Sequence, residues 1–334
     1  MLLHQELNVN GKLALHNRLV LPPMDTERSD QASGRITDEL VAYYEERIRG
    51  GYIGLVILEH CYIAPNGKAN PRQVSMADDS VIEPLRKLTD MAHAHGTKII
   101  AQISHAGSMA SPTVTGIADF IAPSPVVNSG KRQKDEGAPR EMTKEEILEL
   151  EEQFVQAARR VKAAGFDGVE IHSAHSYMLN QFYSPLTNLR TDEYGGDPTG
   201  RMRVHMEILA KVRAEVGEEY PIAMRLGGSD YMEGGASIDD AVEASRRLEA
   251  AGLDLLDLSG GMCRYLMPDR PYPGYFSDMS SAVKAAVSIP VILTGGITEA
   301  ADAERLLAEG AADLIGVGRA MMKDPRWAEK AMAE

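Results

Sequence analysis

Two histidines and a tyrosine stand close together near the middle of the sequence, in His172-Ser-Ala-His175-Ser-Tyr177. Imidazoles three residues apart can point into one cavity, where they could ligate zinc or donate hydrogen bonds to a carbonyl or nitro oxygen. Zinc would need a third ligand; Asp257 is available, but no second His-x-His or Glu-x-x-His cluster accompanies the motif. In the alternative interpretation, Tyr177 is a weak acid suited to protonating a carbanion-like centre.

Two glycine turns near the end of the sequence offer a different chemistry. Gly295-Gly296 and Gly318-Arg319 each follow an apolar run and precede a helical pattern. Glycines let backbone N–H groups approach an anion, and the Arg319 guanidinium can bind phosphate oxygens in pairs. The two turns predict a phosphate site, for a cofactor or a phosphorylated substrate. The structural alternative is a pair of tight turns that only need glycine.

Arg225 lies inside an apolar run, Ala-Met-Arg-Leu. A buried guanidinium needs an anionic or polar partner, which is either a neighbouring carboxylate or a cofactor that is negatively charged when reduced. No lysine stands at the end of an expected strand, which argues against a Schiff-base aldolase. A metal-dependent hydrolase lacks its ligand set.

The elements that must position these residues follow a regular alternation. Short, continuously apolar runs are typical of parallel strands covered on both faces, and each run here is followed by a helical pattern. We expect strands at residues 19–24, 54–59, 98–104, 168–172, 222–226, 255–259, 291–294 and 314–317. We expect helices at residues 38–49, 80–94, 144–164, 200–216, 238–251, 278–286, 300–309 and 325–333, the third with a capping box of Thr143 and Glu146.

Eight strands in strict alternation predict an α/β fold, a (β/α)8 TIM barrel formed as a single domain by residues 1–334. A doubly wound sheet is disfavoured because the first strand ends in Pro22-Pro23-Met24 rather than in a glycine-rich turn. Asn10-Gly11 predicts an N-terminal β-hairpin over the bottom of the barrel. Long βα loops after strands three and four, residues 104–142 and 173–199, are expected to wall the active site at the opposite face.

Composition excludes several classes of partner. The net charge of −14 argues against nucleic acid and anionic membranes. No stretch approaches 18 consecutive apolar residues, and no signal peptide is recognisable, so a cytoplasmic location is expected. The two cysteines, Cys61 and Cys263, form neither a disulfide framework nor a spaced run for an iron–sulfur cluster, so neither is expected within this sequence.

Taken together, these residues resemble the Old Yellow Enzyme family of FMN-dependent NAD(P)H oxidoreductases and ene-reductases. The similarity covers essentially the whole chain. The most specific stretch is Gly168–Tyr177, followed by Ser184–Gly196 and Arg201. Further matches are Leu15–Met24, which resembles the family's opening strand, Gln102 with His105-Ala-Gly107, Ala122–Pro125, and Pro273-Gly-Tyr275.

The resemblance implies FMN as the cofactor, NADH or NADPH as the electron donor and a small enone- or enoate-type substrate. It implies that Gln102 and Arg225 contact the flavin ring, and that the two glycine turns hold the FMN phosphate. His172 and His175 would grip the activating oxygen of the substrate, and Tyr177 would deliver the proton. The full set of implied cofactor-binding residues is Pro23, Met24, Asp25, His60, Gln102, Arg225, Gly295, Gly296, Gly318 and Arg319. Related barrels often self-associate, so a homo-oligomer is an expectation.

The sequence departs from the family pattern at two positions. Asp25 stands where a Thr, Ser or Cys usually contacts the flavin C4 carbonyl, and His60 stands where a small residue is more common. We hypothesise that Asp25 and His60 interact and lower the flavin potential. Two alternatives stay open: an FMN-dependent dehydrogenase of a small amine or other donor, and a metal- or phosphate-dependent barrel hydrolase or lyase.

Overall fold

Eight parallel strands close into a barrel in the order β10-β11-β12-β3-β4-β5-β8-β9. The computed structural model describes residues 1–128, 136–267 and 269–333. The strands are β3 (Leu19–Leu21), β4 (Leu55–Tyr62), β5 (Lys98–Ser104), β8 (Gly168–Ser173), β9 (Ile222–Ser229), β10 (Leu255–Gly260), β11 (Val291–Thr294) and β12 (Leu314–Gly316). The predicted (β/α)8 barrel is confirmed. The first strand is shorter than predicted, because Pro22 and Pro23 have no N–H group to donate to a neighbouring strand.

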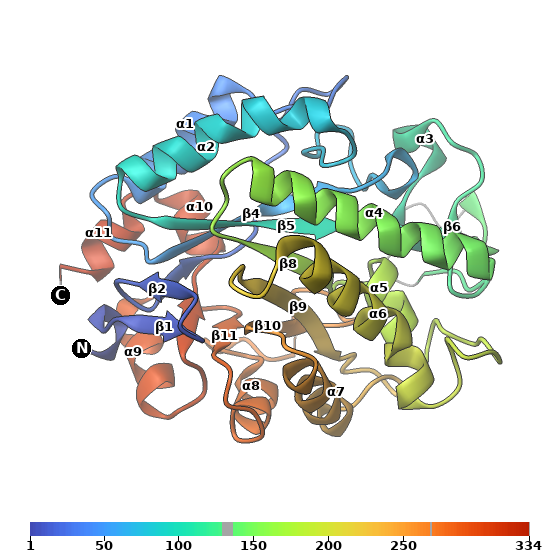
Figure 1. Cartoon of the computed structure of the whole chain (residues 1–334). Coiled ribbons are helices and arrows are strands. Elements are labelled where there is room, and N and C mark those ends of the chain that lie inside the picture. Colours follow the sequence, from blue (N-terminus) through green and yellow to red (C-terminus); the bar gives the residue numbers. More distant parts are fainter. Residues whose placement is uncertain (129–135, 268, 334) are drawn as a thin grey trace.

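Helices surround the barrel on its outside (Figure 1). They are α1 (Asp38–Ile48), α2 (Ile82–Ala94), α4 (Lys144–Ala163), α6 (Pro198–Val216), α7 (Ile238–Ala250), α8 (Ser277–Lys284), α9 (Ala300–Ala308), α10 (Arg319–Lys323) and α11 (Trp327–Ala331). The capping box of Thr143 and Glu146 is confirmed.

Most helix boundaries differ from the prediction by one or two residues, and three of the differences have a clear physical reason. Helix α6 begins two residues earlier, because the Asp197 side chain accepts a hydrogen bond from the Gly200 N–H and Pro198 fits the first turn. Helix α2 begins later, after a 3-10 turn at Asp79–Val81. The C-terminal helix predicted at 325–333 is the shorter α11, separated from the unpredicted α10 by Asp324 and by Pro325, which cannot continue a helix.

The N-terminal hairpin is confirmed and fills one end of the barrel. Strands β1 (Leu7–Val9) and β2 (Leu13–Leu15) pair antiparallel. Asn10 and Gly11 both have positive φ, 50° and 75°, as a tight hairpin turn between twisted strands requires. Val9, Leu13 and Leu15 of the hairpin share one buried cluster with inward side chains of the barrel strands, so the hairpin closes the barrel by apolar packing.

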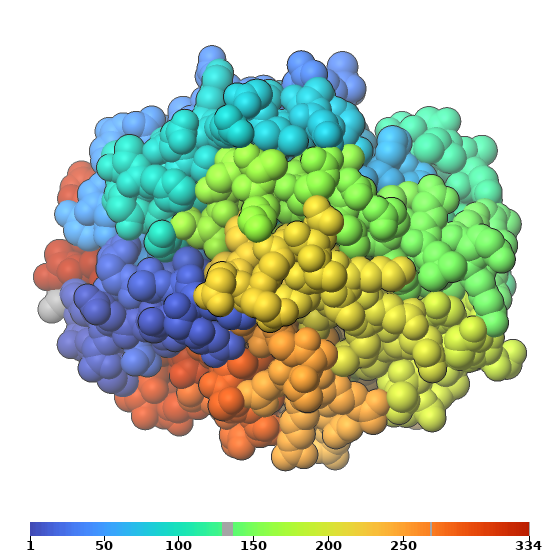
Figure 2. Space-filling view, viewed as in Figure 1, coloured from blue at the N-terminus to red at the C-terminus, as the bar shows by residue number. Residues whose placement is uncertain are grey.

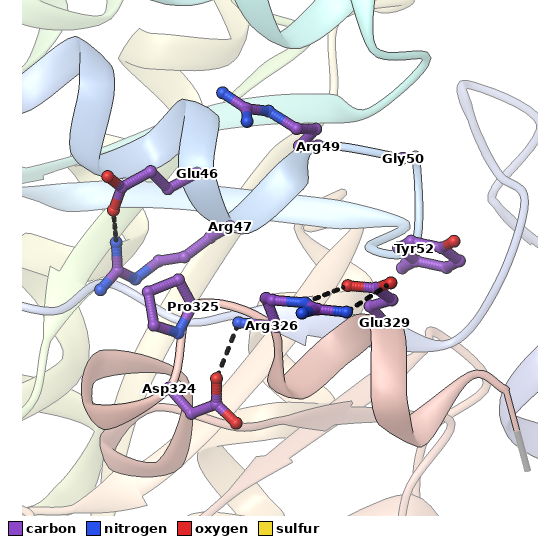
Figure 3. A pocket seen from close by; sticks show the side chains of 9 residues that line it. All are labelled: Glu46, Arg47, Arg49, Gly50, Tyr52, Asp324, Pro325, Arg326 and Glu329. Atoms are coloured by element: carbon purple, nitrogen blue, oxygen red, sulfur yellow. Dashed lines mark hydrogen bonds and ion pairs between the residues drawn. The ribbon is translucent and has the colours of Figure 1, made fainter.

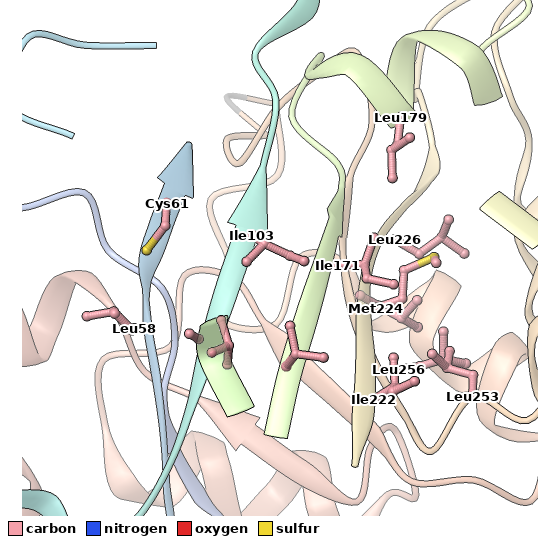
Figure 4. Close-up of a cluster of buried hydrophobic side chains, with 14 of the residues drawn as sticks. Leu58, Cys61, Ile103, Ile171, Leu179, Ile222, Met224, Leu226, Leu253 and Leu256 are labelled. Carbon is pink, nitrogen blue, oxygen red and sulfur yellow. The ribbon is translucent and has the colours of Figure 1, made fainter. Parts of the chain in front are cut away.

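The barrel interior changes from apolar to polar along its axis. Ile100 and Ala223 lie in the apolar cluster beside the hairpin. Side chains alternate with a period of two, so Gln102 and Arg225 point into the same interior one layer further from the hairpin. The intervening side chains, such as Ile103 and Met224, belong to the outer hydrophobic cluster that also contains residues of the surrounding helices; Figure 4 shows both on their strands among other buried apolar side chains. Because all eight strands run in the same direction, their polar inward side chains lie together at the carboxyl end of the barrel.

The long loops lie at the end opposite the hairpin. Both chain termini are at the hairpin end (Figure 1), and in Figure 2 the blue N-terminal residues fill the surface between the cyan and red segments. The loop after β5 contains a 3-10 turn (Gly107–Met109), α3 (Pro112–Thr115) and the small parallel pair β6 (Ile121–Ala122) and β7 (Arg140–Glu141). The loop after β8 contains α5 (Met178–Tyr183). None of the described helices is long and apolar enough to cross a membrane.

Candidate active site

The structure brings the β8 motif together at the carboxyl end of the barrel. The His172 ring centroid lies 5.2 Å from that of His175 and 5.1 Å from that of Tyr177. The Nε2 of His175 shares a hydrogen bond of 2.7 Å with Ser259 Oγ on β10. The three side chains therefore face one another at the carboxyl-end opening of the barrel, which we call the mouth.

The backbone of this motif is strained in a way that points to function. His175 and Ser176 have positive φ, 60° and 66°, a conformation that costs side-chain-bearing residues roughly 1–3 kcal/mol each. Three buried amides hold the turn. Asn180 Oδ1 accepts from the Ser176 N–H at 2.8 Å, while Asn128 and Gln181 donate to the Ser176 carbonyl. This support keeps the rings of His175 and Tyr177 turned into the mouth.

Burial and nearby charge set the protonation states of His172, His175 and Tyr177. Burial lowers the pKa of His172 and of His175 well below the usual range, and the nearby Arg225 charge lowers both further. Burial raises the pKa of Tyr177. At neutral pH the site therefore presents two neutral imidazoles and a protonated phenol. The Nδ1 of His172 is buried and has no hydrogen-bond partner among the described residues.

The two glycine turns lie side by side, because β11 and β12 pair with Thr294 opposite Gly316. A Cβ placed on Gly295 or on Gly296 would lie 2.8 Å from the Tyr275 ring. Within the described part of the chain, the backbone N–H groups of both turns donate to no protein acceptor; these are the N–H groups of Gly295, Gly296, Gly318 and Arg319. Unpaired donors at adjacent strand ends fit a phosphate group.

Arg225 and Gln102 occupy the polar layer of the interior. The Nε of Arg225 lies 3.2 Å from Asp257 Oδ2, but without hydrogen-bond geometry, so both atoms remain unpartnered. Gln102 Nε2 donates to Glu170 Oε1 at 2.7 Å, and burial keeps the pKa of Glu170 well above its usual value. The expected carboxylate partner of Arg225 is present, and the guanidinium keeps unused hydrogen-bonding capacity for an electron-rich ring edge. These residues and the glycine turns fit the flavin and the phosphate of FMN.

The residues after β3 and β4 lie around the same mouth. Met24 is next to the second glycine turn, since a Cβ on Gly318 would lie 2.6 Å from the Met24 sulfur. Asp25 is exposed, and its Oδ2 accepts a hydrogen bond of 2.9 Å from Asn70. His60 Nε2 lies 3.3 Å from Tyr177 Oη. Burial lowers the pKa of His60 and the Asp25 charge opposes that shift, so these two residues interact through charge while their hydrogen bonds go elsewhere.

The loop between β10 and α8 supplies Tyr265, which sequence reasoning did not single out, and Tyr275, which it noted as part of a family match without a role. The Tyr265 ring lies 5.7 Å from the His175 ring, edge to face. Tyr275 Oη donates to the Tyr265 carbonyl at 2.6 Å and receives a hydrogen bond of 3.2 Å from Arg319 Nη2. Tyr275 therefore joins the glycine turns to the β8 motif. The available signal was three tyrosines within one long βα segment, at 265, 272 and 275.

A surface cavity of about 600 Å³ lies elsewhere, between the end of α1 and the α10–α11 segment (Figure 3). It contains none of the candidate residues. Two of its three arginines are already engaged: Arg47 donates to the carbonyls of Tyr43, Met321 and Met322, and Arg326 pairs with Glu329. The candidate residues therefore lie at the barrel mouth and not in this cavity.

A parallel barrel whose mouth combines an anion-binding turn, an unsatisfied guanidinium and a phenol between imidazoles defines a class, the flavin-dependent barrel oxidoreductases. The family can then be stated. The sequence matches the NADH:flavin oxidoreductase / NADH oxidase family over residues 5–334, and the chain belongs to that family. Membership confirms FMN as the cofactor, with NADH or NADPH as the electron donor, and confirms the resemblance found in the sequence.

Individual relatives agree with this assignment. The chain is 40% identical over 326 residues to the NADH oxidase of Thermoanaerobacter brockii, covering 96% of this chain and 49% of the relative. It is 36% identical over 322 residues to the NADPH dehydrogenase of Halalkalibacterium halodurans, covering 96% of this chain and 91% of the relative. The chain thus spans about half the length of the first of these relatives and nearly all of the second.

Two solved structures share the fold. A 2-naphthoyl-CoA reductase in complex with 2-naphthoyl-CoA has a TM-score of 0.92 and 29% identity, covering 99% of this chain and 52% of that one. An old yellow enzyme homologue from Zymomonas mobilis has a TM-score of 0.84 and 28% identity, covering 98% of this chain and 93% of that one.

Proposed function

We propose that this chain takes hydride from NADH or NADPH and reduces the activated C=C bond of small enone- or enoate-type substrates. In this proposal residues 1–334 act as one FMN-binding unit. The observation that carries the proposal is the close grouping of His172, His175 and Tyr177 on a strained turn at the barrel mouth.

When bound, FMN supplies the hydride chemistry, accepting hydride from the nicotinamide and returning it to the β-carbon of the substrate. The side chains supply the rest. The neutral imidazoles of His172 and His175 donate hydrogen bonds to the activating oxygen and stabilise the negative charge that develops on it. Ser259 orients His175 for this role. The protonated phenol of Tyr177 gives its proton to the α-carbon.

The cofactor would be held at both ends of its length. The unpaired N–H groups of the glycine turns and the Arg319 side chain would bind the phosphate. Arg225 would stabilise negative charge on the reduced ring, and Gln102 would hydrogen-bond the ring edge. The residues following β3 and β4 complete the proposed contact set, namely Pro23, Met24, Asp25 and His60.

The loop after β10 bears on the substrate. Tyr265 adds an aromatic face next to His175, and 43% of its surface is exposed. A flat, conjugated acyl group would pack against such a ring. The similarity to a structure that holds 2-naphthoyl-CoA supports the same class of substrate.

An absorbance spectrum of the purified protein, followed by anaerobic addition of NADH and then of NADPH, tests the proposal. Yellow bands that bleach, and that return when 2-cyclohexenone or cinnamaldehyde is added, are the expected result. Bleaching without reoxidation by any conjugated carbonyl compound would sink the substrate assignment. Bands that resist both nucleotides would favour the alternative, a dehydrogenase of small amines or other donors.

A further inference from the structure

Strand β4 contains an irregularity beside the site. Its pairing with β5 places Leu58 opposite Ala101 and Cys61 opposite Ile103. Two residues of β4, Glu59 and His60, therefore face the single residue Gln102 between those pairs. This is a β-bulge, a feature that is common next to active sites because it redirects side chains.

The side chains of the two bulge residues, Glu59 and His60, point in different directions. Thr26 Oγ1 donates to Glu59 Oε2 at 2.6 Å, and Tyr44 of α1 donates to the same carboxyl at 3.5 Å, so Glu59 faces the helix layer. His60 turns to the mouth. Its ring stacks on the Tyr177 ring with centroids 5.4 Å apart and an angle of 26°, and its Nε2 lies 3.3 Å from Tyr177 Oη.

The position of His60 is firmly held. Gln73 Nε2 donates to the His60 carbonyl at 3.1 Å, and only 8% of the residue surface is exposed. Charged and titratable groups face the His60 ring from three other strands. They are Asp25 after β3, Arg225 on β9, and His172 and Tyr177 at the end of β8. Of these, Tyr177 is the one in hydrogen-bond contact.

When Tyr177 gives up its proton inside the mouth, the phenolate that remains needs a hydrogen-bond donor, and His60 lies close enough to be that donor. Burial opposes the phenolate form of Tyr177, so its release of a proton is favourable only if a neighbouring donor compensates it. Within the described residues, neither Arg225 nor Asp25 makes a hydrogen bond with the Tyr177 oxygen, whereas His60 Nε2 lies 3.3 Å from it. The imidazole of His60 carries an N–H group and lies at the phenol oxygen.

We propose that His60 is the residue that returns a proton to Tyr177. As the O–H bond of Tyr177 breaks and the new C–H bond forms on the substrate, the Nε2–H of His60 donates to the phenol oxygen. That proton moves to the oxygen, and the imidazole takes a proton from water at Nδ1. His60 acts through Tyr177, so it is a positioning and relay residue. The inference rests on the proposed function.

One measurement needs no turnover. Nitrogen-15 NMR of the purified holoprotein identifies which ring nitrogen of His60 carries the proton. We expect the proton on Nε2, where it points to Tyr177, and a shift of that resonance in Tyr177→Phe. A proton on Nδ1, with Nε2 accepting from the phenol, would overturn the relay even if the enzyme proves to be an ene-reductase.

The second measurement follows the two half-reactions of His60→Ala and His60→Gln. We expect substrate reduction to slow about 100-fold in both variants, with a much smaller change in flavin reduction by nicotinamide, since His60 also belongs to the proposed FMN contact set. Imidazole added to the buffer should restore the rate of His60→Ala, where it can fill the space, and should not restore that of His60→Gln. Wild-type rates in His60→Gln, or equal losses in both half-reactions, contradict the relay. A wild-type protein that reduces no conjugated carbonyl compound would refute the proposed function instead, and the NMR result would still decide the role of His60.

Discussion

The ring of Tyr275 covers the backbone of Gly296 so closely that a Cβ on Gly296 would lie 2.8 Å from the ring carbons. This contact places the aromatic ring against the Gly295-Gly296 turn, whose N–H groups donate to no acceptor in the described part of the chain. Tyr275 also binds Arg319 and the carbonyl of Tyr265. One tyrosine therefore connects the glycine turns with the β8 motif, which are the proposed cofactor and substrate sides of the mouth.

Gly296→Ala is the first prediction that follows. Gly296 has φ of 69°, and the added methyl would push against Tyr275, so we expect FMN to bind at least about tenfold more weakly. Release of fluorescent FMN on dilution measures the change. Gly310→Ala is the matched control, because Gly310 has φ of 71° and open space around its Cβ position. Equal FMN loss in the two variants would mean that backbone strain alone, and not the phosphate turn, controls binding.

Asp25→Asn tests the hypothesis taken from the sequence. A carboxylate beside the flavin disfavours the negatively charged reduced form, so its removal should raise the flavin potential, on the order of 20 mV for an exposed group. Redox titration against a dye of known potential gives the value. Glu27→Gln removes an equally exposed charge two residues further along and should leave the potential unchanged. An unchanged potential in Asp25→Asn would reject the hypothesis.

Glu59 makes stability depend on pH. Burial raises its pKa to about 8, although the hydrogen bond from Thr26 opposes the shift. Between about pH 4.5, where the unfolded carboxyl ionises, and pH 8, the folded protein binds more protons than the unfolded chain, so its stability falls as the pH rises. Glu59→Gln mimics the protonated acid and should lose this dependence. Urea unfolding at pH 5 and pH 9 should show the variant gaining a few kcal/mol on the wild type at the higher pH. Parallel behaviour of the two proteins would show that Glu59 ionises normally.

Tyr177→Phe separates the two halves of the reaction. The phenol is needed for protonation of the substrate and not for hydride transfer from the nicotinamide, so substrate reduction should slow by about 100-fold or more while flavin reduction is spared. Stopped-flow absorbance follows each half-reaction separately. If both fall by the same factor, Tyr177 supports the cofactor site and another group donates the proton.

The barrel and much of the site could be predicted because both depend on regular patterns. Short apolar runs that alternate with helical patterns predict the strands. The period of two along β8 and β9 places His172 and Arg225 on the inside of the barrel. Strand ends in a parallel barrel converge, so residues as distant in sequence as Gly296 and Gly318 meet at one mouth. The Asn-Gly turn likewise predicts the hairpin.

Features that break the pattern could not be predicted. The bulge in β4 leaves the apolar run intact, so nothing in the sequence shows that His60 points to Tyr177 while Glu59 points to Thr26. The loop after β10 turns on Arg264, which has φ of 64° without being a glycine. Its course, and hence the contact of Tyr265 with His175, depends on tertiary packing rather than on local propensity.

That contact leads to the last prediction. Tyr265 lies edge to face with His175 and offers its surface to a conjugated substrate, so Tyr265→Ala should raise KM for aryl enones about tenfold. The rate of flavin reduction should not change, because in the proposed mechanism the nicotinamide half-reaction does not depend on the packing of an aryl group against Tyr265. Tyr272→Ala is the control, since Tyr272 lies on the same loop with 47% of its surface exposed, and within the described residues its ring packs against neither His175 nor Tyr177. Steady-state kinetics with an aryl enone and with 2-cyclohexenone, which lacks the aromatic ring, separate the two effects. A larger loss for 2-cyclohexenone than for the aryl enone would mean that Tyr265 holds His175 in place rather than binding the substrate.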